Sequence, residues 1–281
     1  MTVLESIQKS ADFLAKRGVE SPRLQTELLL AHLLKMPRMN LYLNFERVLT
    51  PAETELLREA IMRRSRREPL QHIVGSTSFC GFEMAVNRHT LVPRPETELL
   101  AEAGWTFLSA INHPSTALDF GTGTGCLAIA LAAKCPEVKI IALDISAEAL
   151  TLAKENAAKN NVVGRIEFLQ SDGFDALNTA QFDLIISNPP YIPTGEIATL
   201  QPEVRDFDPR AALDGGMDGL DFYRMLAVRA KAHLKSFGKI MMEFGDGQAE
   251  AIRRIFENEK WIVETVKEDY SQRARILIAR T

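Results

Sequence analysis

The stretch Leu118-Asp119-Phe120-Gly121-Thr122-Gly123-Thr124-Gly125 carries most of the information on how this chain folds. It begins as a short apolar strand and then turns through closely spaced glycines into a helix. Glycines at such a turn let a ligand lie against bare backbone, and the helix N-terminus offers N–H donors without partners. The stretch therefore predicts a strand, a ligand-binding turn and a helix in succession.

Strands and helices alternate around this turn, after Pro114. The apolar runs are residues 117–120, 139–143, 166–169, 182–187 and 239–244, and helix-like stretches such as 147–159 and 220–235 lie between them. This alternation predicts an α/β fold with a mostly parallel sheet and helices on both faces. Residues 261–266 and 274–279 are expected to close the sheet as an antiparallel hairpin, because a final hairpin needs no crossover helix.

The first third of the chain is predicted to be helical. Ser21 places a capping hydroxyl before Pro22 at a first helical position, and a Leu-rich run follows. Thr50 and Glu53 have the spacing of a capping box, ahead of a second amphipathic run. With a leading helix near residues 3–15, these segments predict a small helical bundle.

Short β-like segments connect this bundle to the sheet. They lie at residues 79–86, around Gly81, and at residues 91–92, and they indicate a hairpin. We therefore expect a helical bundle at residues 1–68, a β-hairpin linker at 69–92 and a ligand-binding domain at 93–281.

A basic cluster ends the bundle, and it consists of Arg58, Arg63, Arg64, Arg66 and Arg67. Cations in the last turn of a helix complement the helix dipole, so a solvated helix end is the preferred interpretation. A contact with nucleic acid or with a partner is the alternative.

Composition restricts the class of protein. Of 281 residues, 46% are hydrophobic and 25% are charged, as in ordinary globular domains and unlike disordered chains. The net charge of −4 provides no overall positive field for non-specific nucleic-acid binding. No stretch approaches the ~18 apolar residues of a membrane span. We expect a cytoplasmic protein without a membrane partner.

Cysteines and histidines give no sign of a disulfide or a metal site. Cys80, Cys126 and Cys135 form no C-x-x-C pair, and we interpret them as buried small residues. The histidines His72, His89 and His113 have no metal-ligand or triad spacing, so we treat them as structural or surface residues.

Two acids mark the kind of ligand that the glycine turn binds. Asp119 precedes the first glycine by two residues, where it would repel a pyrophosphate but attract the ammonium of an amino-acid-like cofactor. Asp144 ends the next strand, at the place where an acid grips ribose hydroxyls. Together they favour an adenosyl cofactor. The alternatives are a tight turn without a ligand, and a helix cap at Asp144.

Asn188-Pro189-Pro190-Tyr191 follows a buried strand, at the sheet edge where α/β proteins bind ligands. The Asn188 side-chain oxygen and the Pro189 carbonyl can accept the two hydrogens of a planar amino group, while Tyr191 offers an aromatic wall. Such acceptors favour a nitrogen that becomes tetrahedral and positively charged during reaction. The alternative is a loop that merely ends the strand.

These motifs together resemble a class I S-adenosyl-L-methionine-dependent methyltransferase that acts on an amino nitrogen. The segments Pro69–Gly75, Phe79-Cys80-Gly81, Leu91–Glu98, Pro209–Gly216 and Glu243-Phe244-Gly245 make the chain similar to the bacterial family that methylates release factors. That family modifies the side-chain amide nitrogen of the glutamine in the Gly-Gly-Gln loop of peptide chain release factors. The likeness runs from about Pro69 to the C-terminus, and the helical bundle suits the same family's N-terminal substrate-recognition domain. The resemblance implies that residues 93–281 are the S-adenosyl-L-methionine-dependent methyltransferase domain.

The resemblance implies roles for individual residues. It assigns Asp119, Gly121, Thr122, Gly123, Thr124, Gly125, Asp144, Gly173 and Asn188 to the cofactor, and Asn188, Pro189, Pro190 and Tyr191 to the substrate glutamine. Asn188, Pro189 and Tyr191 would be catalytic. The resemblance implies release factors as partners, with no nucleic-acid substrate, no metal and a monomeric enzyme.

Two departures from the family pattern leave questions open. Many relatives place an aromatic residue after a Ser-Asp pair to cover the adenine, but Gly173 follows Ser171-Asp172 here, so Phe174 or another side chain must supply that surface. Near the C-terminus, Gln272-Arg273-Ala274-Arg275 replaces the usual Gly-Arg-Asp-Arg.

The segment at residues 93–98 has two interpretations. It could close over the methionine end of the cofactor, with Arg94 or Thr97 as the polar contact, or it could simply begin a helix at Pro95.

Two other functions fit parts of the sequence. A nucleic-acid methyltransferase acting on adenine N6 or guanine N2 would use the same amino-group pocket, and the arginine cluster favours it. A non-catalytic adenosyl-binding adaptor would use only the glycine turn and the bundle.

Overall fold

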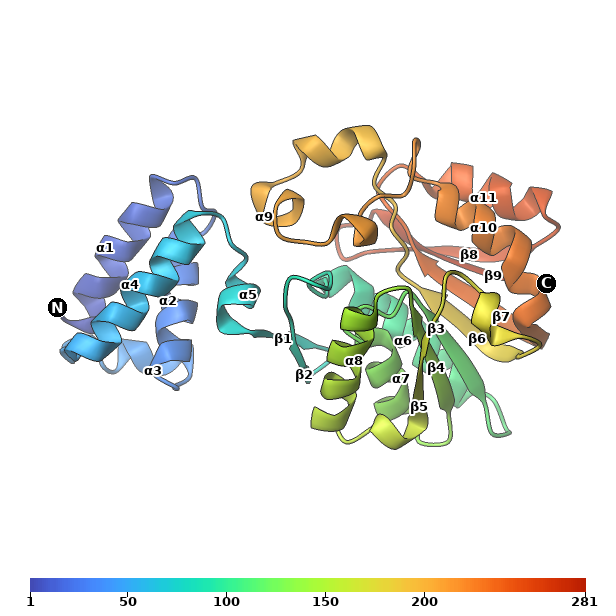
Figure 1. Ribbon diagram of the computed structural model, residues 1–281, viewed down its shortest axis with the longest axis horizontal. Helices are drawn as coiled ribbons and strands as arrows, with labels where there is room; N and C mark the ends of the chain where they lie inside the picture. Colours follow the sequence, from blue (N-terminus) through green and yellow to red (C-terminus); the bar gives the residue numbers. More distant parts are fainter. The chain divides into compact units, whose positions relative to one another are not determined.

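The computed structural model describes all of residues 1–281 and divides into two compact units. Unit 1 comprises residues 1–76 and 201–207, and unit 2 comprises residues 77–200 and 208–281 (Figure 1). Residues 69–92 are thus shared between the two units instead of forming a linker unit of their own. The chain also leaves unit 2 at residue 201 and re-enters it at residue 208.

Unit 1 is helical and has its own apolar core. Its helices are α1 (Val3–Ala15), α2 (Pro22–Leu33), α3 (Arg38–Tyr42), α4 (Pro51–Ser65), α5 (Leu70–Val74) and α9 (Pro202–Arg205). Apolar side chains at helical spacing on α1, α2 and α4, such as Ile7, Leu30 and Leu57, meet in this core. Burying these faces against each other is what holds short helices together.

The helix starts show which capping signals act. Thr50 and Glu53 form the predicted capping box, with the Glu53 amide donating to Thr50 Oγ1 at 3.2 Å and the Thr50 amide donating to Glu53 Oε2 at 2.9 Å. The prediction for Ser21 is wrong: its φ is +46° and its hydroxyl caps no amide. The left-handed backbone at Ser21 points the side chain away from the first turn.

A β-hairpin follows unit 1. Strands β1 (Ser76–Phe79) and β2 (Phe82–Ala85) pair as a two-stranded sheet. Cys80 and Gly81 connect them, both with positive φ, as the tight turns of two-residue hairpins require. The β-like segment expected at residues 91–92 has no strand.

Unit 2 is built on a seven-stranded sheet with the order β5-β4-β3-β6-β7-β9-β8. The strands are β3 (Thr116–Phe120), β4 (Lys139–Asp144), β5 (Ile166–Gln170), β6 (Phe182–Ser187), β7 (Leu234–Glu243), β8 (Ile262–Glu268) and β9 (Ala274–Arg280). The first five strands in this order are parallel, and β9 runs antiparallel to β7 and to β8. The predicted class I methyltransferase fold with its closing hairpin is confirmed.

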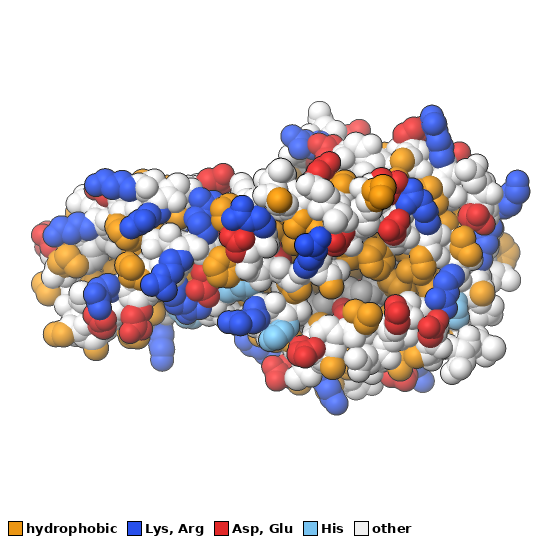
Figure 2. Space-filling model, turned by 45° about the horizontal axis from the view of Figure 1, so that its top comes forward, with side chains coloured by type: hydrophobic (Ala, Val, Ile, Leu, Met, Phe, Trp, Pro, Cys, Tyr) orange, Lys and Arg blue, Asp and Glu red, His pale blue; other side chains and the backbone are white.

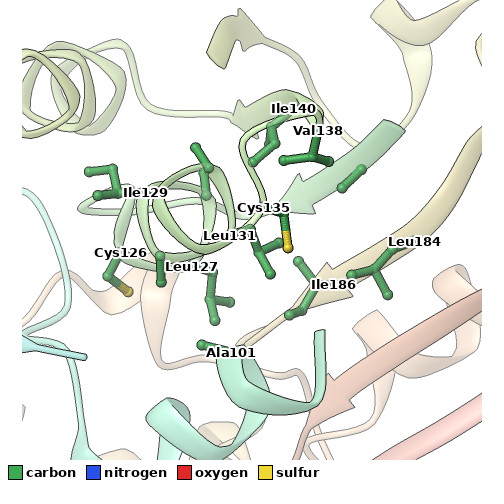
Figure 3. Close-up of a cluster of buried hydrophobic side chains, with 14 of the residues drawn as sticks. Ala101, Cys126, Leu127, Ile129, Leu131, Cys135, Val138, Ile140, Leu184 and Ile186 are labelled. Atoms are coloured by element: carbon green, nitrogen blue, oxygen red, sulfur yellow. The ribbon is translucent and has the colours of Figure 1, made fainter. Parts of the chain in front are cut away.

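Helices cover both faces of this sheet (Figure 1). The helices are α6 (Pro95–Ser109), α7 (Cys126–Lys134), α8 (Ala147–Lys159), α10 (Asp221–Arg229) and α11 (Ala249–Asn258). Alternate strand residues face opposite layers, so Ala117 packs toward α6 and α7 whereas Leu118 packs toward α10 and α11. Figure 3 shows the first layer, where Leu131 of α7 meets Leu184 and Ile186 of β6.

Short 3₁₀ turns complete the fold: η1 (Val163–Arg165), η2 (Asp175–Leu177), η3 (Thr194–Thr199), η4 (Arg210–Ala212) and η5 (Ala230–His233). None of the helices has the length and apolar character needed to cross a membrane.

The boundary between α10 and β7 differs from the prediction. We expected a helix at residues 220–235 and a strand from residue 239, but α10 ends at Arg229 and β7 begins at Leu234. Leu234 pairs with Phe182 and Lys239 pairs with Leu184, so residues 235–238 bulge out of the sheet. Phe237 has a φ of +67° and is 87% exposed. The bulge interrupts the alternating pattern and hides the beginning of the strand.

Candidate active site

A cavity of about 530 Å³ lies in unit 2, a size typical of small-ligand sites. It opens at the carboxyl ends of β3, β4 and β6, where the sheet order reverses direction and α/β proteins bind ligands. Its walls include these predicted site residues: Gly121, Thr122, Gly123, Thr124, Asp144, Gly173, Asn188, Pro189 and Pro190. Asp119, Gly125 and Tyr191 lie close by but outside the cavity wall.

The glycine turn presents bare backbone to this cavity. Gly121 and Gly123 have φ values of +74° and +54°, and an added Cβ on either glycine would meet nothing within 4 Å. Gly125 has a different task, since its close approach to Ala153 lets α7 pack against α8. The turn is tied to β4 because the Gly121 amide donates to the Leu143 carbonyl at 2.9 Å.

Asp119 lies beneath the glycine turn and is fully buried. Its Oδ2 accepts hydrogen bonds from Thr122 Oγ1 at 2.6 Å and from the Ala128 amide at 3.1 Å, but its Oδ1 has no partner. Burial raises the pKa of this carboxyl to about 7, and the nearby charge of Asp144 acts in the same direction. A buried acceptor without a donor is costly, so this site favours a ligand that brings a cation or a donor.

Asp144 links the end of β4 to the glycine turn. Its Oδ2 accepts from the Gly123 amide at 2.8 Å, and its Oδ1 accepts from the Ser146 amide at 3.0 Å. The alternative that Asp144 caps the next helix is wrong, because Ser146 Oγ accepts from the Ala149 amide and caps α8. Each Asp144 oxygen has a second lone pair with which it can accept a hydroxyl hydrogen from a ligand.

Asn188 and Pro189 present two oxygens without protein donors. No backbone or side-chain donor of the chain hydrogen-bonds to Asn188 Oδ1 or to the Pro189 carbonyl. Prolines at two successive positions contribute no N–H group of their own. The end of β6, just before Asn188, is fixed because Ser187 Oγ donates to the Phe120 carbonyl at 2.7 Å and so ties β6 to β3.

The opposite end of the Asn188 side chain points into the protein. Its Nδ2 donates to Thr97 Oγ1 at 3.1 Å, and Thr97 Oγ1 donates to Glu243 Oε2 at 2.7 Å. Thr97 and Glu243 are each only 2% exposed. Burial raises the pKa of Glu243 to about 7, although the Thr97 hydrogen bond and the charge of Arg275 act to lower it.

The two interpretations of residues 93–98 are compatible. Pro95 is the first residue of α6, so the segment does begin a helix. Pro93, Arg94 and Thr97 also line the cavity, and Arg94 is held by Asp208 Oδ2 at 2.8 Å.

The loop that carries Asn188 is braced from outside the cavity. Gln248 Nε2 donates to the Tyr191 carbonyl at 2.9 Å, and Gln248 Oε1 accepts from the Gly245 amide at 2.9 Å. Gly219 has a φ of +76°, and an added Cβ there would lie 2.3 Å from the Tyr191 carbonyl oxygen. The spacing of Gly219 and Gln248 in the sequence gives no sign of these contacts.

Tyr191 does not form the aromatic wall that we expected in this cavity. Its ring is half-buried, belongs to the core near α10 and α11, and packs so closely on Gly245 that a Cβ there would lie 2.9 Å from the ring. Burial raises the pKa of its hydroxyl to about 12. Tyr191 is absent from the cavity wall, and Gln248 holds its backbone carbonyl.

Phe174, one candidate for the adenine surface, does not line the cavity. Phe174 is buried, and its ring stacks on His233 with centroids 4.9 Å apart. The apolar side chains that line the same cavity as Gly173 include Ile145, which is 59% exposed, and Phe222 of α10. Ile145 directly follows Asp144, a signal that sequence reasoning passed over.

Most of the basic cluster is paired with acids. Arg58 pairs with Glu55, Arg63 pairs with Glu68, and both Arg64 and Arg67 pair with Glu203. On the face drawn in Figure 2, the basic side chains of unit 1 stand among acidic ones. This pairing leaves little positive charge for a nucleic acid.

Comparisons with known proteins agree with this geometry. Two family models match the chain, the PrmC N-terminal domain at residues 5–75 and the Methyltransferase small domain at residues 98–201. A release factor glutamine methyltransferase from Geobacter sulfurreducens is 42% identical over 255 residues, which are 91% of this chain and 88% of the relative. The chain belongs to the release factor glutamine methyltransferase family.

Other members of this family and more distant structures fit the same picture. A release factor glutamine methyltransferase from Cereibacter sphaeroides is 39% identical over 281 residues, which cover 100% of this chain and 99% of the relative. The crystal structure of a methyltransferase from Pyrococcus furiosus shares the fold, with a TM-score of 0.53 at 20% identity over 78% of this chain and 97% of that one. The family resemblance drawn from the motifs is thus confirmed.

Proposed function

We propose that this chain transfers a methyl group from S-adenosyl-L-methionine to the side-chain amide nitrogen of the glutamine in the Gly-Gly-Gln motif of peptide chain release factors. The observation that carries the proposal is the pair of oxygens on Asn188 and Pro189, free of protein donors and placed in the cavity formed by the glycine turn. Family membership supports the same substrate.

Residues around the glycine turn fit the cofactor. The unpartnered Oδ1 of Asp119 suits the ammonium of its amino-acid end, and the open faces of Gly121 and Gly123 leave room against the backbone. Asp144 would accept ribose hydroxyls, and Ile145 and Phe222 would contact the adenine near Gly173. When bound, S-adenosyl-L-methionine supplies an electrophilic methyl carbon on a sulfonium.

The substrate half of the site solves the problem of a weak nucleophile. An amide nitrogen has a delocalised lone pair, so it reacts only if its geometry shifts toward tetrahedral. Asn188 Oδ1 and the Pro189 carbonyl would each hold one N–H bond and would stabilise positive charge as it develops on the nitrogen. Thr122, Thr124 and Pro190 would shape the cavity around the reacting groups, and Gly125 would support the turn through its packing on Ala153. Tyr191 would hold the loop through its packing on Gly245.

Other features of the proposal follow from this substrate. Release factors act in translation, so the enzyme would work in the cytoplasm. The enzyme would act as a monomer on its release factor substrate. No group of three or more His, Cys, Asp or Glu side chains lies together in a way that could hold a metal ion.

The test is methyl transfer from labelled cofactor. The enzyme is incubated with a release factor, with duplex DNA and with ribosomal RNA in separate reactions, and incorporated label is counted. We expect label in the release factor alone. Label that enters only nucleic acid would overturn the proposal, and no label in any acceptor would support the adaptor alternative.

A further inference from the structure

The Asn188 side chain can face the cavity in two ways. Its oxygen end accepts hydrogen bonds and its nitrogen end donates them. A substrate amide group that offers two N–H hydrogens needs the oxygen end. The nitrogen end would present hydrogens to hydrogens and repel the substrate, so catalysis depends on which end is held inside the protein.

Three elements converge behind Asn188. Thr97 is in the first turn of α6, Glu243 is the last residue of β7, and Asn188 directly follows β6. Their side chains form one hydrogen-bonded chain from Asn188 Nδ2 to Thr97 Oγ1 and from Thr97 Oγ1 to Glu243 Oε2. The chain is buried at Thr97 and Glu243, so water does not compete for either hydrogen bond.

The number of available hydrogens decides which group donates in each of these two hydrogen bonds. An ionised carboxylate accepts and cannot donate, so Thr97 must give its single hydroxyl hydrogen to Glu243. Thr97 Oγ1 then has only lone pairs for Asn188, and it can face only the Nδ2 end. The Asn188 oxygen is thereby turned toward the cavity before any substrate arrives.

We propose that Glu243, acting through Thr97, is the positioning group that fixes the Asn188 amide with its oxygen toward the substrate glutamine. This inference rests on the proposed function, because the oxygen-out orientation matters only for an acceptor that offers N–H groups. Neither Glu243 nor Thr97 needs to touch the reacting nitrogen for this role. Thr97 lies 91 positions from Asn188 and 146 positions from Glu243 along the chain, and folding brings the three side chains together.

Several charged groups surround Glu243 and set its protonation. Burial raises its pKa most, and the charge of Glu96 of α6 also raises it. The side chains of Thr97 and Asn188 and the charge of Arg275 of β9 lower it. The Tyr223 hydroxyl of α10 donates to the Glu243 backbone carbonyl at 2.8 Å and therefore fixes the residue without touching its carboxylate. Once protonated, Glu243 can donate to Thr97, whose hydrogen is then free to hold the Asn188 oxygen and turn the nitrogen end outward.

Paired substitutions at Thr97 separate positioning from packing. Thr97→Val keeps the shape and removes the hydroxyl, whereas Thr97→Ser keeps the hydroxyl. We expect Thr97→Val to lower kcat for release factor methylation about tenfold, as the loss of one orienting hydrogen bond implies, with KM for the cofactor unchanged. Thr97→Ser should retain kcat within about twofold of the wild type, because its hydrogen bonds remain.

Glu243→Gln tests the carboxylate itself. A glutamine side chain can accept from or donate to Thr97, so it no longer fixes the direction of the chain. We expect a lower kcat and the loss of the acidic limb of the kcat–pH profile, which in the wild type should fall as pH drops below the raised pKa of about 7. Asp183→Asn is the matched control: it removes another buried acid of the same sheet, which pairs with Lys235 at the opposite end of β6, and should leave the acidic limb in place.

A spectroscopic readout tests the inference without turnover. In ¹⁵N-labelled protein, the side-chain amide signal of Asn188, identified by its loss in Asn188→Ala, should exchange slowly with water in the wild type and in Thr97→Ser. It should exchange rapidly in Thr97→Val. Equal kcat and equal exchange in the Val and Ser variants would overturn the inference. A wild-type protein that protects this amide but labels no release factor would instead overturn the proposed function.

Discussion

Burial at single residues prepares this site for its ligands. Asp119 keeps a carboxylate oxygen without a partner, and Asn188 keeps its side-chain oxygen free of protein donors. The protein accepts the cost of one orphaned buried acceptor at Asp119 because a bound cation removes that cost. In the proposed mechanism the orientation of the Asn188 amide is fixed in advance, so little reorganisation would be needed when charge develops on the substrate nitrogen.

Replacing Asn188 tests the proposed acceptor. Asn188→Ala removes an interaction that strengthens in the transition state, so we expect kcat to fall ~100-fold or more with cofactor affinity largely intact. Steady-state kinetics with release factor, together with calorimetric titration of the cofactor, measures both quantities. Unchanged turnover would contradict the mechanism, and an equal loss of cofactor affinity would show that Asn188 serves binding instead.

The raised pKa of Asp119 leads us to predict that the affinity for the cofactor depends on pH. A pKa of about 7 means that the carboxyl is mostly neutral at pH 6 and mostly ionised at pH 8. Only the ionised form attracts the cofactor's ammonium, so affinity should rise as pH increases through this range. Calorimetric titrations at several pH values check this, and Asp119→Asn should bind more weakly with a flat profile. A flat profile in the wild type would refute the assigned partner of Asp119.

At the residue scale, the sequence identifies motifs within one segment but does not identify contacts between distant segments. The glycines, Asp144 and the Asn-Pro-Pro-Tyr motif could be identified because each residue type has a distinctive chemistry at a strand end. The hydrogen bonds among Asn188, Thr97 and Glu243 could not, because they join residues from three elements whose sequence spacing is unrelated to their contact. Tyr191 was expected to face the ligand, yet its neighbours turn its ring toward Gly245.

At the scale of the elements, the position of the loop after β6 depends on the close approach of the loop that carries Gly219. Gly219→Ala would place a Cβ 2.3 Å from the Tyr191 carbonyl and would strain a backbone with φ of +76°. We expect it to displace the loop and to reduce stability by about 1–3 kcal/mol, with a larger loss in kcat than in cofactor affinity. Denaturant unfolding and kinetics measure these effects.

Gly164→Ala is the control for this substitution. An added Cβ at Gly164 meets nothing within 4 Å, and its φ is not positive, so stability and kcat should be unchanged. Equal behaviour of the two alanine variants would mean that the Gly219 contact does not hold the loop.

The elements also differ in how well their sequences predict them. The strands β3, β4 and β6 and the helix α8 carry continuous apolar or helical patterns, and the structure places them where those patterns lie. The start of β7 was missed because the bulge at residues 235–238 breaks the pattern with exposed side chains. Ser21 had the residue type of a cap but not the backbone geometry of one.

At the scale of the whole molecule, Glu203 joins residues 201–207, which are distant in sequence, to the helices of unit 1. Glu203 accepts from Arg64 at 2.6 Å and from Arg67 at 2.7 Å, and these two arginines lower its pKa. Arg64 is only 4% exposed and also donates to Gln25. The arginines that suggested nucleic acid therefore stabilise the fold of unit 1.

Removing Glu203 should destabilise the protein. Glu203→Ala leaves Arg64 buried without its acid, which costs about 3 kcal/mol when a buried pair is broken. Thermal and urea unfolding measure this change. Glu55→Ala is the control, because it removes an acid from the solvent-exposed pair with Arg58 and should leave stability unchanged. Equal midpoints for both variants would show that the Glu203 pair does not stabilise unit 1.

The most direct test of the central claim is the mass of one peptide. A release factor is incubated with the enzyme and S-adenosyl-L-methionine, digested, and its Gly-Gly-Gln peptide is fragmented to locate the modification. We predict one added methyl group on the glutamine side chain with the wild-type enzyme and almost none with Asn188→Ala. An unmodified glutamine, or a methyl group on another residue of the peptide, would contradict the account.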